Sequence, residues 1–401
     1  MVKLADIEAA QALLAGITHV TPLAFSRALE ARVGGPVHLK CENLQRTGSF
    51  KPRGAYTRIH GLTDAERARG VVAASAGNHA QGVAYAASLL GAEATVFMPE
   101  AAPIPKVEAT RSYGAQIRFY GGSVDDALVG ARAYADETGA VLIHPFDHRD
   151  VVAGQGTVGL EVLEQCPDVR TVVVCTGGGG LLAGIAVAVK ALRPDVEVVG
   201  VQAAGAAAYP ASLAAGHPVA LGSMATMADG IAVGRPGDVP FALIRDNVDR
   251  IVTVDEDELS RALLLCLERA KMVIEPAGSA AVAAVLARPQ DFRPPVVAIL
   301  SGGNIDPLLL GKVIHHGMVA AGRYLSLDLR IPDRPGELAR LLTVLGSTRS
   351  NVLDIAHRRS NIGLNLEEVE VSVQLETRGA DASDALVGEL EQAGFAVRSH
   401  D

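Results

Sequence analysis

The chain has 401 residues, a formal net charge of −9 at pH 7 and an apolar fraction of 49%. This length indicates two or three domains, and the acidic balance and absence of tryptophan exclude a protein that binds nucleic acid through phosphates or base stacking. No apolar run could span a bilayer, and residues 1–17 lack the apolar core of a signal peptide. The four cysteines have neither paired nor metal-ligand spacing, which indicates free thiols in a reducing compartment. We therefore expect a cytoplasmic protein without membrane or nucleic-acid partners.

Strand-like and helix-like segments alternate along the first three quarters of the chain. The expected strands are 36–41, 70–74, 94–98, 116–120, 171–175, 196–201, 250–254 and 295–300. The expected helices are 78–90, 105–113, 124–137, 156–165, 181–192, 257–271 and 277–287, and the alanine-rich segment 203–215 is ambiguous. This alternation predicts an α/β fold with parallel sheets that helices cover on both faces.

One lysine occupies a position suited to chemistry. Lys51 lies between a small polar turn, 47–49, and Pro52, which can open a helix. A lysine fixed at such a corner beside Phe50 can be partly desolvated, which lowers its pKa and frees the amine to form a Schiff base. The same spacing also fits a surface lysine at a helix start.

A run of glycines follows the expected strand 171–175 and precedes a helix. The residues concerned are Gly177, Gly178, Gly179, Gly180 and Leu181. Consecutive glycines let backbone amides converge at the positive end of a helix, which suits a phosphate. The run also matches a dinucleotide-binding pattern, but Glu197 begins the next strand, whereas the acid of that pattern ends it. Because the pattern matches only in part, an NAD-dependent oxidoreductase is kept as the alternative from a different class.

Other turns also follow strands. Ser75, Ala76, Gly77, Asn78 and His79 form one of them. Their amides and side chains could bind an anion such as a substrate carboxylate, although Asn78 also fits a helix cap and His79 a core histidine. The turn at 301–304 fits an ordinary loop, the pair 229–230 fits a plain turn, and the residues from Glu275 onward are interpreted as a helix start rather than a pocket wall.

The string ENLQRTGSFKPRGA, residues 42–55, resembles the lysine motif of the fold type II pyridoxal phosphate (PLP) enzymes, specifically the threonine and serine dehydratases. The resemblance covers nearly the whole chain. It implies a tryptophan synthase β-like catalytic domain in residues 1–320, with a smaller subdomain at roughly 50–150 inserted.

The resemblance also implies roles for single residues. Lys51 would carry the cofactor and remove the Cα proton, and the glycine run would hold the cofactor's phosphate. Phe50, Asn78 and Gly230 would lie beside the cofactor, and the turn 75–79 would bind the substrate. Ser301 would face the pyridine nitrogen, where a hydroxyl favours loss of a β-leaving group over transamination.

These roles imply β-elimination of L-threonine, and of L-serine, to 2-oxobutanoate or pyruvate and ammonia. The mammalian-type serine racemases that the chain resembles carry a serine at the position of Ala76, and the methyl group of alanine cannot transfer a proton. This favours elimination, and the alternative within the family is a racemase or a β-replacing enzyme. Gln202 and Ala208 stand where these relatives carry metal-binding acids, so we expect no metal.

The pattern changes near Gly322. Strands at 324–331, 351–358, 367–376 and 396–399 and helices at about 337–345 and 382–393 predict a βαββαβ ferredoxin-like unit. The strings DRPGEL (333–338) and NVLDI (351–355) resemble an ACT domain. Residues 325–401 would then bind an amino-acid effector and regulate an enzyme of amino-acid metabolism, such as isoleucine biosynthesis. A plain dimerisation module is the alternative, and we expect a homo-oligomer, a dimer or a tetramer.

Overall fold

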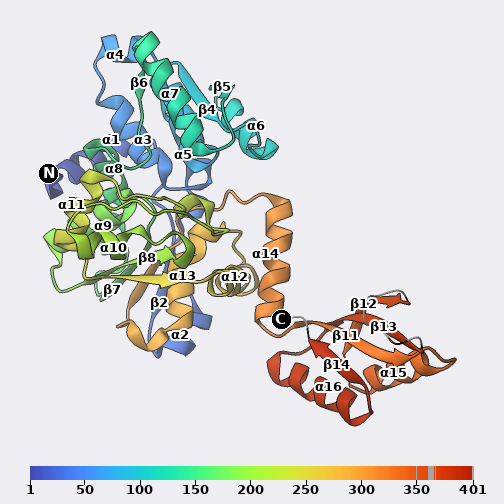
Figure 1. Cartoon of the computed structure of the whole chain (residues 1–401). Helices are drawn as coiled ribbons and strands as arrows, with labels where there is room; N and C mark the ends of the chain where they lie inside the picture. Colours follow the sequence, from blue (N-terminus) through green and yellow to red (C-terminus); the bar gives the residue numbers. More distant parts are fainter. Residues whose placement is uncertain (349, 360–364, 366, 400–401) are drawn as a thin grey trace. The chain divides into compact units, whose positions relative to one another are not determined.

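The computed structural model describes residues 1–348, 350–359, 365 and 367–399, and the chain divides into two compact units, Met1–Leu310 and Gly311–Asp401 (Figure 1). The division falls within helix α14 (Pro307–Ala320), before the change of pattern near Gly322. That change marks the first strand of the second unit and not the end of the first unit.

The larger sheet of the first unit has the strand order β1-β2-β10-β7-β8-β9. Its strands are β1 (Leu23–Phe25), β2 (Val37–Lys40), β7 (Thr171–Cys175), β8 (Glu197–Ala203), β9 (Arg250–Val254) and β10 (Val296–Ile299). Strand β1 is antiparallel to β2 and the other neighbours are parallel. Every residue of β7 and β10 is buried, so both faces of the sheet are covered.

Helices α9 (Gly180–Leu192) and α13 (Pro276–Ala287) pack directly against the larger sheet, and α8 (Arg149–Gln165) and α11 (Asp238–Asn247) pack against α9. The remaining α-helices of the first unit are α1 (Leu4–Leu14), α2 (Arg27–Val33), α3 (Lys51–His60), α4 (Asp64–Ala68), α5 (Asn78–Leu89), α6 (Ile104–Ser112), α7 (Val124–Thr138), α10 (Ala208–Ala215) and α12 (Glu256–Leu265). Shorter turns of helix are η1 (Glu42–Leu44), η2 (Arg46–Gly48), η3 (Ala204–Ala206), η4 (Asp229–Ile231), the π-helix η5 (Cys266–Ala270) and η6 (Pro289–Asp291).

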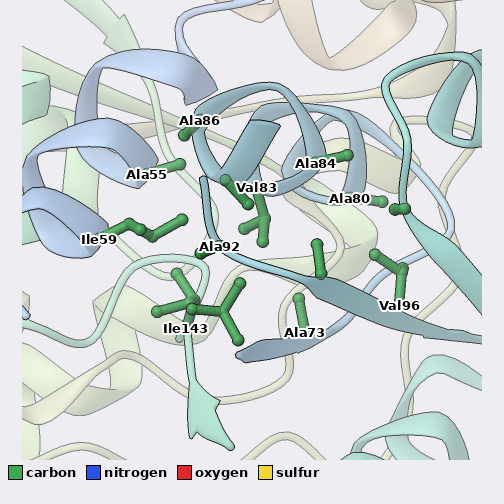
Figure 2. Packing of buried hydrophobic residues seen from close by; sticks show 14 of the residues in the cluster. Ala55, Ile59, Ala73, Ala80, Val83, Ala84, Ala86, Ala92, Val96 and Ile143 are labelled. Carbon is green, nitrogen blue, oxygen red and sulfur yellow. The ribbon is translucent and has the colours of Figure 1, made fainter. Parts of the chain in front are cut away.

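The smaller sheet is inserted between β2 and β7 in the sequence. It consists of parallel strands in the order β5 (Gln116–Phe119), β4 (Ala94–Met98), β3 (Val71–Ala74) and β6 (Val141–Leu142). One face packs on α5 and α3, where Ile59, Val83 and Val96 meet small alanines (Figure 2). The other face packs on α7 through Ala127 and Ala131.

The second unit has the order βαββαβ: β11 (Tyr324–Pro332), α15 (Glu337–Ser347), β12 (Asn351–Arg358), β13 (Glu368–Glu376), α16 (Ala380–Gln392) and β14 (Ala396–Ser399). Its antiparallel sheet has the order β12-β13-β11-β14. Alternate residues of β11 and β13 point into a core with the two helices, as a half-buried sheet requires. The predicted fold class, parallel α/β sheets followed by a βαββαβ unit, is confirmed. No helix in the described part of the chain could cross a membrane.

Candidate active site

Lys51 is the first residue of α3, directly after the two 3-10 turns η1 and η2. Its Nζ donates a hydrogen bond to the carbonyl of Pro145 (3.1 Å) and lies 5.1 Å from the centre of the Phe50 ring. Burial lowers the pKa of Lys51 to about 8, with the nearby Cys175 and Glu275 opposing this shift. A much larger fraction of the amine is therefore neutral and nucleophilic near neutral pH than for a lysine in water.

The segment before the lysine is joined to the turn that follows β10. The amide of Phe50 donates to the carbonyl of Ser301 (3.1 Å), and Ser49 pairs with Gly302 in an isolated bridge. The hydroxyl of Ser49 is buried and has no partner in the described chain. Ser301 is itself buried, so both hydroxyls lie in the interior beside the lysine segment.

A buried ion network fixes α3 from the other side. Arg53 pairs with Glu42 (2.8 Å) and with Glu161 of α8 (2.6 Å), and Lys40 of β2 also pairs with Glu161 (2.6 Å). Burial opposes ionisation of Glu42, but the Arg53 guanidinium prevails and lowers the pKa of that carboxyl. The network ties the lysine segment to β2 and α8.

The glycine run forms the turn from β7 into α9. None of the backbone amides from Gly177 to Leu181 donates a hydrogen bond to any residue that the structure describes. A Cβ at Gly178 would collide with the Phe146 ring, and one at Gly179, where φ is +100°, would collide with the Tyr209 hydroxyl. Only glycine fits at these positions, and the free amides at the start of α9 fit a phosphate.

Phe146 connects this loop to the lysine. Its ring and backbone pack against Gly178 and Gly180, and the preceding residue, Pro145, accepts the hydrogen bond of Lys51. A phosphate bound by these amides and an aldehyde joined to the amine would therefore both lie close to the loop of Pro145 and Phe146. The residues present fit a phosphorylated aldehyde such as PLP.

The turn between β3 and α5 carries a second set of free amides, those of Ala76, Asn78 and His79, which have no partner among the described residues. The amide of Gly77 donates to the Ser75 hydroxyl (3.1 Å). The ring of His79 is buried with its Nε2 2.7 Å from the Ile143 carbonyl, and burial lowers its pKa to about 3. His79 is thus a neutral core histidine whose ring is directed to the protein interior.

Asn78 and Gly230 lie together against α13. The Asn78 side-chain nitrogen donates to Glu275 Oε1 (2.5 Å), and its oxygen accepts from Asn304 (2.8 Å). Gly230 belongs to η4, and a Cβ there would lie 3.0 Å from that of Ala277 and 3.8 Å from Glu275 Oε1. Turn η4 also touches the glycine loop, because a Cβ at Gly177 would lie 3.0 Å from the Cα of Ile231.

The structure thus brings Phe50, Lys51, Asn78, Gly230, Ser301 and the glycine loop into one connected set of contacts. Leu181 contributes only its amide, since its side chain is buried in α9. Sequence reasoning missed the loop around Pro145 and Phe146, which matches no motif. It also assigned Glu275 to a helix start, which is correct but incomplete, because the same carboxyl is buried against Asn78.

Gln202 and Ala208, the positions at which relatives would carry metal-binding acids, have other roles in the fold. Gln202 accepts a hydrogen bond from the Tyr209 amide (2.9 Å) and Ala208 begins α10. The described residues contain no group of three or more His, Cys, Asp or Glu side chains that could hold a metal ion. The absence of a metal stays a prediction.

Comparisons with known proteins agree with this geometry. Residues 15–302 match the family described as pyridoxal-phosphate dependent enzyme. An L-threonine ammonia-lyase of Thermotoga maritima is 44% identical over 398 residues, which cover 99% of each chain. The processed form of threonine deaminase isoform 2 from Solanum lycopersicum superimposes with a TM-score of 0.75 at 37% identity, covering 78% of this chain and 92% of that chain. Maize serine racemase superimposes with a TM-score of 0.74 at 37% identity, covering 79% of this chain and 98% of the racemase chain.

The family match spans both sheets of the first unit, from the residue that follows α1 to the turn that follows β10. It therefore includes the lysine, the glycine loop and the turns that contact them. The chain belongs to the family of pyridoxal-phosphate dependent enzymes.

Proposed function

We propose that the chain is a threonine ammonia-lyase that converts L-threonine to 2-oxobutanoate and ammonia, and L-serine to pyruvate and ammonia. The single observation that carries the proposal is the partly buried amine of Lys51, with its lowered pKa, close to a loop of unpartnered amides. The names of the relatives from Thermotoga maritima and Solanum lycopersicum give the reaction class. The cofactor is PLP, as in the rest of the family.

The residues around the lysine divide the work of holding the cofactor. The amides of 177–181 would bind its phosphate, Phe50, Asn78 and Gly230 would line its ring, and Ser301 would meet its pyridine nitrogen. When bound, PLP withdraws electrons from the substrate's Cα and so acidifies the Cα proton. Lys51 would serve as the general base, because a pKa of about 8 leaves a substantial fraction of its amine neutral near that pH.

The substrate's carboxylate would bind at the turn 75–79, where backbone amides without a partner lie at the N-terminal end of α5. Ala76 supports elimination over racemisation, because a methyl group can neither remove nor deliver a proton on the opposite face. The likeness to maize serine racemase keeps racemisation as the second candidate, and formation of D-serine from L-serine would reveal it.

The decisive experiment replaces the lysine. Lys51→Ala should retain the fold by circular dichroism but lose 2-oxobutanoate formation and the covalent cofactor adduct that borohydride fixes. Lys3→Ala, a change at an exposed lysine, is the matched control and should behave as the wild type. Near-normal turnover by Lys51→Ala would overturn the proposal.

We also propose that residues 1–320 form the catalytic domain and that residues 325–401 form an ACT domain that binds an amino-acid effector. The βαββαβ order and the strings at 333–338 and 351–355 support this, as does the maize racemase, of which 98% aligns with only 79% of this chain. Calorimetric titration of the full chain with single amino acids should give saturable binding and altered kinetics for at least one. Binding of none would favour a plain dimerisation module.

The chain is further proposed to be a homo-oligomer, a dimer or a tetramer, and to work in the cytoplasm. All four cysteines are free and buried, which supports a reducing compartment. Light scattering of the full chain measures the subunit number directly, and a monomer would refute the oligomer.

A further inference from the structure

Glu275 is a buried acid at the centre of the candidate site. It is the N-cap residue of α13, and only 4% of its surface is exposed. Its amide donates to the carbonyl of Gly302 (3.1 Å), and a Cβ at Gly302 would collide with its Oε1. The carboxyl is therefore held against the turn that carries Ser301, at a position where only glycine leaves room for it.

The same carboxyl determines the orientation of Asn78. Oε1 of Glu275 accepts a hydrogen bond from the Asn78 side-chain nitrogen (2.5 Å), and the Asn78 side-chain oxygen accepts one from the Asn304 side-chain nitrogen (2.8 Å). Asn304 is fixed in turn, because its nitrogen also donates to the Thr47 carbonyl (2.6 Å). Both ends of the Asn78 amide are thus engaged, and the Glu275 end is the only one that can change its charge.

Charged groups face Glu275 from several elements. Asp229 of η4 lies near it, as do Lys106 of α6, Lys51 of α3 and the thiol of Cys175 in β7. Asp229 and Lys106 pair with each other at 2.8 Å. No cation in the described part of the chain forms an ion pair with Glu275 itself. Burial and, to a smaller extent, the charge of Asp229 raise the pKa of Glu275 to about 7, against the opposing effects of Lys106, Asn78 and Lys51.

A buried carboxyl without a cation costs stability when it is ionised, so a hydrophobic or amide side chain would serve the fold better. What the carboxylate adds is a charge-assisted hydrogen bond, roughly twice as strong as a neutral one, and the ability to lose that strength on protonation. A positioning role that depends on pH accounts for both features.

We propose that Glu275 is a positioning residue whose ionised carboxylate holds the Asn78 amide in place, and whose protonation releases that hold and so sets the acid limb of the activity profile. The proposal rests on the proposed function for its kinetic readout but not for its spectroscopic one. The proposal also gives the nearby ion pair a role, because Asp229 raises the pKa of Glu275 and Lys106 lowers it.

The kinetic test compares the pH dependence of kcat for threonine in four proteins. The wild type should lose activity on the acid side with a midpoint near 7. Glu275→Gln should lose the step near 7 and keep any separate decline that follows protonation of the Lys51 amine, whose pKa is about 8. Asp229→Asn should move the midpoint of the step near 7 to lower pH, and Lys106→Met should move it to higher pH. A purely structural role would lower activity at every pH and leave the midpoint in place.

The second readout needs neither cofactor nor turnover. Infrared difference spectra of the cofactor-free wild type across the neutral range should show a protonated-carboxyl band that Glu275→Gln lacks. If the chain proves to have another activity, this band still tests Glu275. If Glu275→Gln fails to fold, the two opposite midpoint shifts carry the test alone. Identical acid limbs in all foldable variants, or a band retained in Glu275→Gln, would overturn the proposal.

Discussion

The ammonium of Lys51 is partly desolvated, which makes the pH at which it reacts a measurable property of one side chain. Since burial lowers its pKa from 10.5 to about 8, the rate at which cofactor-free protein attaches PLP should rise with pH and level off above about 8. Absorbance of the growing adduct measures this rate. A rate that still rises steeply through pH 10.5 would mean an ordinary solvated lysine.

The same shift has a consequence for folding stability. Between about 8 and 10.5 the unfolded chain binds more protons at this position than the folded chain. The stability contribution of Lys51 in the cofactor-free protein therefore increases as pH rises through this window. Lys51→Met should remove that increase from urea unfolding curves.

Gly178 offers a second test at a single residue. Gly178→Ala adds a methyl group where the Phe146 ring already lies, so the loop or the ring must move and the amides lose their alignment. We expect the affinity for PLP to fall by about tenfold or more, which corresponds to about 1.4 kcal/mol. Gly122→Ala is the control, because nothing lies within 4 Å of a Cβ there. Equal affinities in the two variants would show that the loop does not hold the phosphate.

How far single residues could be predicted from the sequence depends on whether their partners are local. The lysine and the glycine run lie within continuous motifs, and backbone amides need no distant partner. Glu275 gave no such signal, because its contact with Asn78 joins residues 197 positions apart. His79 stayed ambiguous for the same reason: its buried ring is satisfied by the carbonyl of Ile143.

The buried ion network around Arg53 fixes helix α3, and Lys51 is the first residue of that helix. Arg53→Met would leave Glu42 buried without its ion-pair partner and Glu161 with Lys40 alone, so we expect a loss of about 3–5 kcal/mol in the free energy of unfolding at pH 7. The pKa of Glu42 is lowered in the fold, so the stability this carboxylate contributes exists above its unfolded value of 4.5 and is lost on acidification. The defect of Arg53→Met should accordingly shrink in acid.

Arg58→Met is the matched control for this prediction. Arg58 lies on the same helix and pairs with Asp150 at 3.6 Å, but both side chains are partly solvated. Its loss should cost no more than about 1 kcal/mol in urea unfolding. Equal costs for the two arginines would contradict a structural role of the buried network.

Elements were predictable where the residue pattern decides the backbone. The bounds of β4, β7, β9, β12 and β14 coincide with the predicted strands. Helix α8 begins at Arg149, before the predicted start at residue 156. The prediction began too late because Gly154 and Gly156 have a low helix propensity. A Cβ at Gly154 would collide with α3, and one at Gly156 would lie 2.7 Å from Ile7 and 2.8 Å from the Gly184 carbonyl. Close packing between helices, which the sequence does not display, overrides the low helix propensity.

At the scale of the whole chain, two compact units each have their own apolar core. Ile59 belongs to a core of the first unit and Leu341 to that of the second, and both are fully buried. Each unit contains enough buried apolar surface to unfold as a cooperative body, so calorimetry of the full chain should resolve two transitions. Ile59→Ala and Leu341→Ala should each cost about 2–5 kcal/mol in the unit concerned.

The two variants control for each other. Leu341→Ala should lower only the transition of the second unit and leave threonine turnover at saturating substrate close to that of the wild type. Ile59→Ala should lower the other transition and, because α3 carries Lys51, reduce the fraction of active protein. If both changes shift one common transition by the same amount, the units unfold as a single body. An effector at the second unit would then act through shared stability and would not require a separate conformational signal.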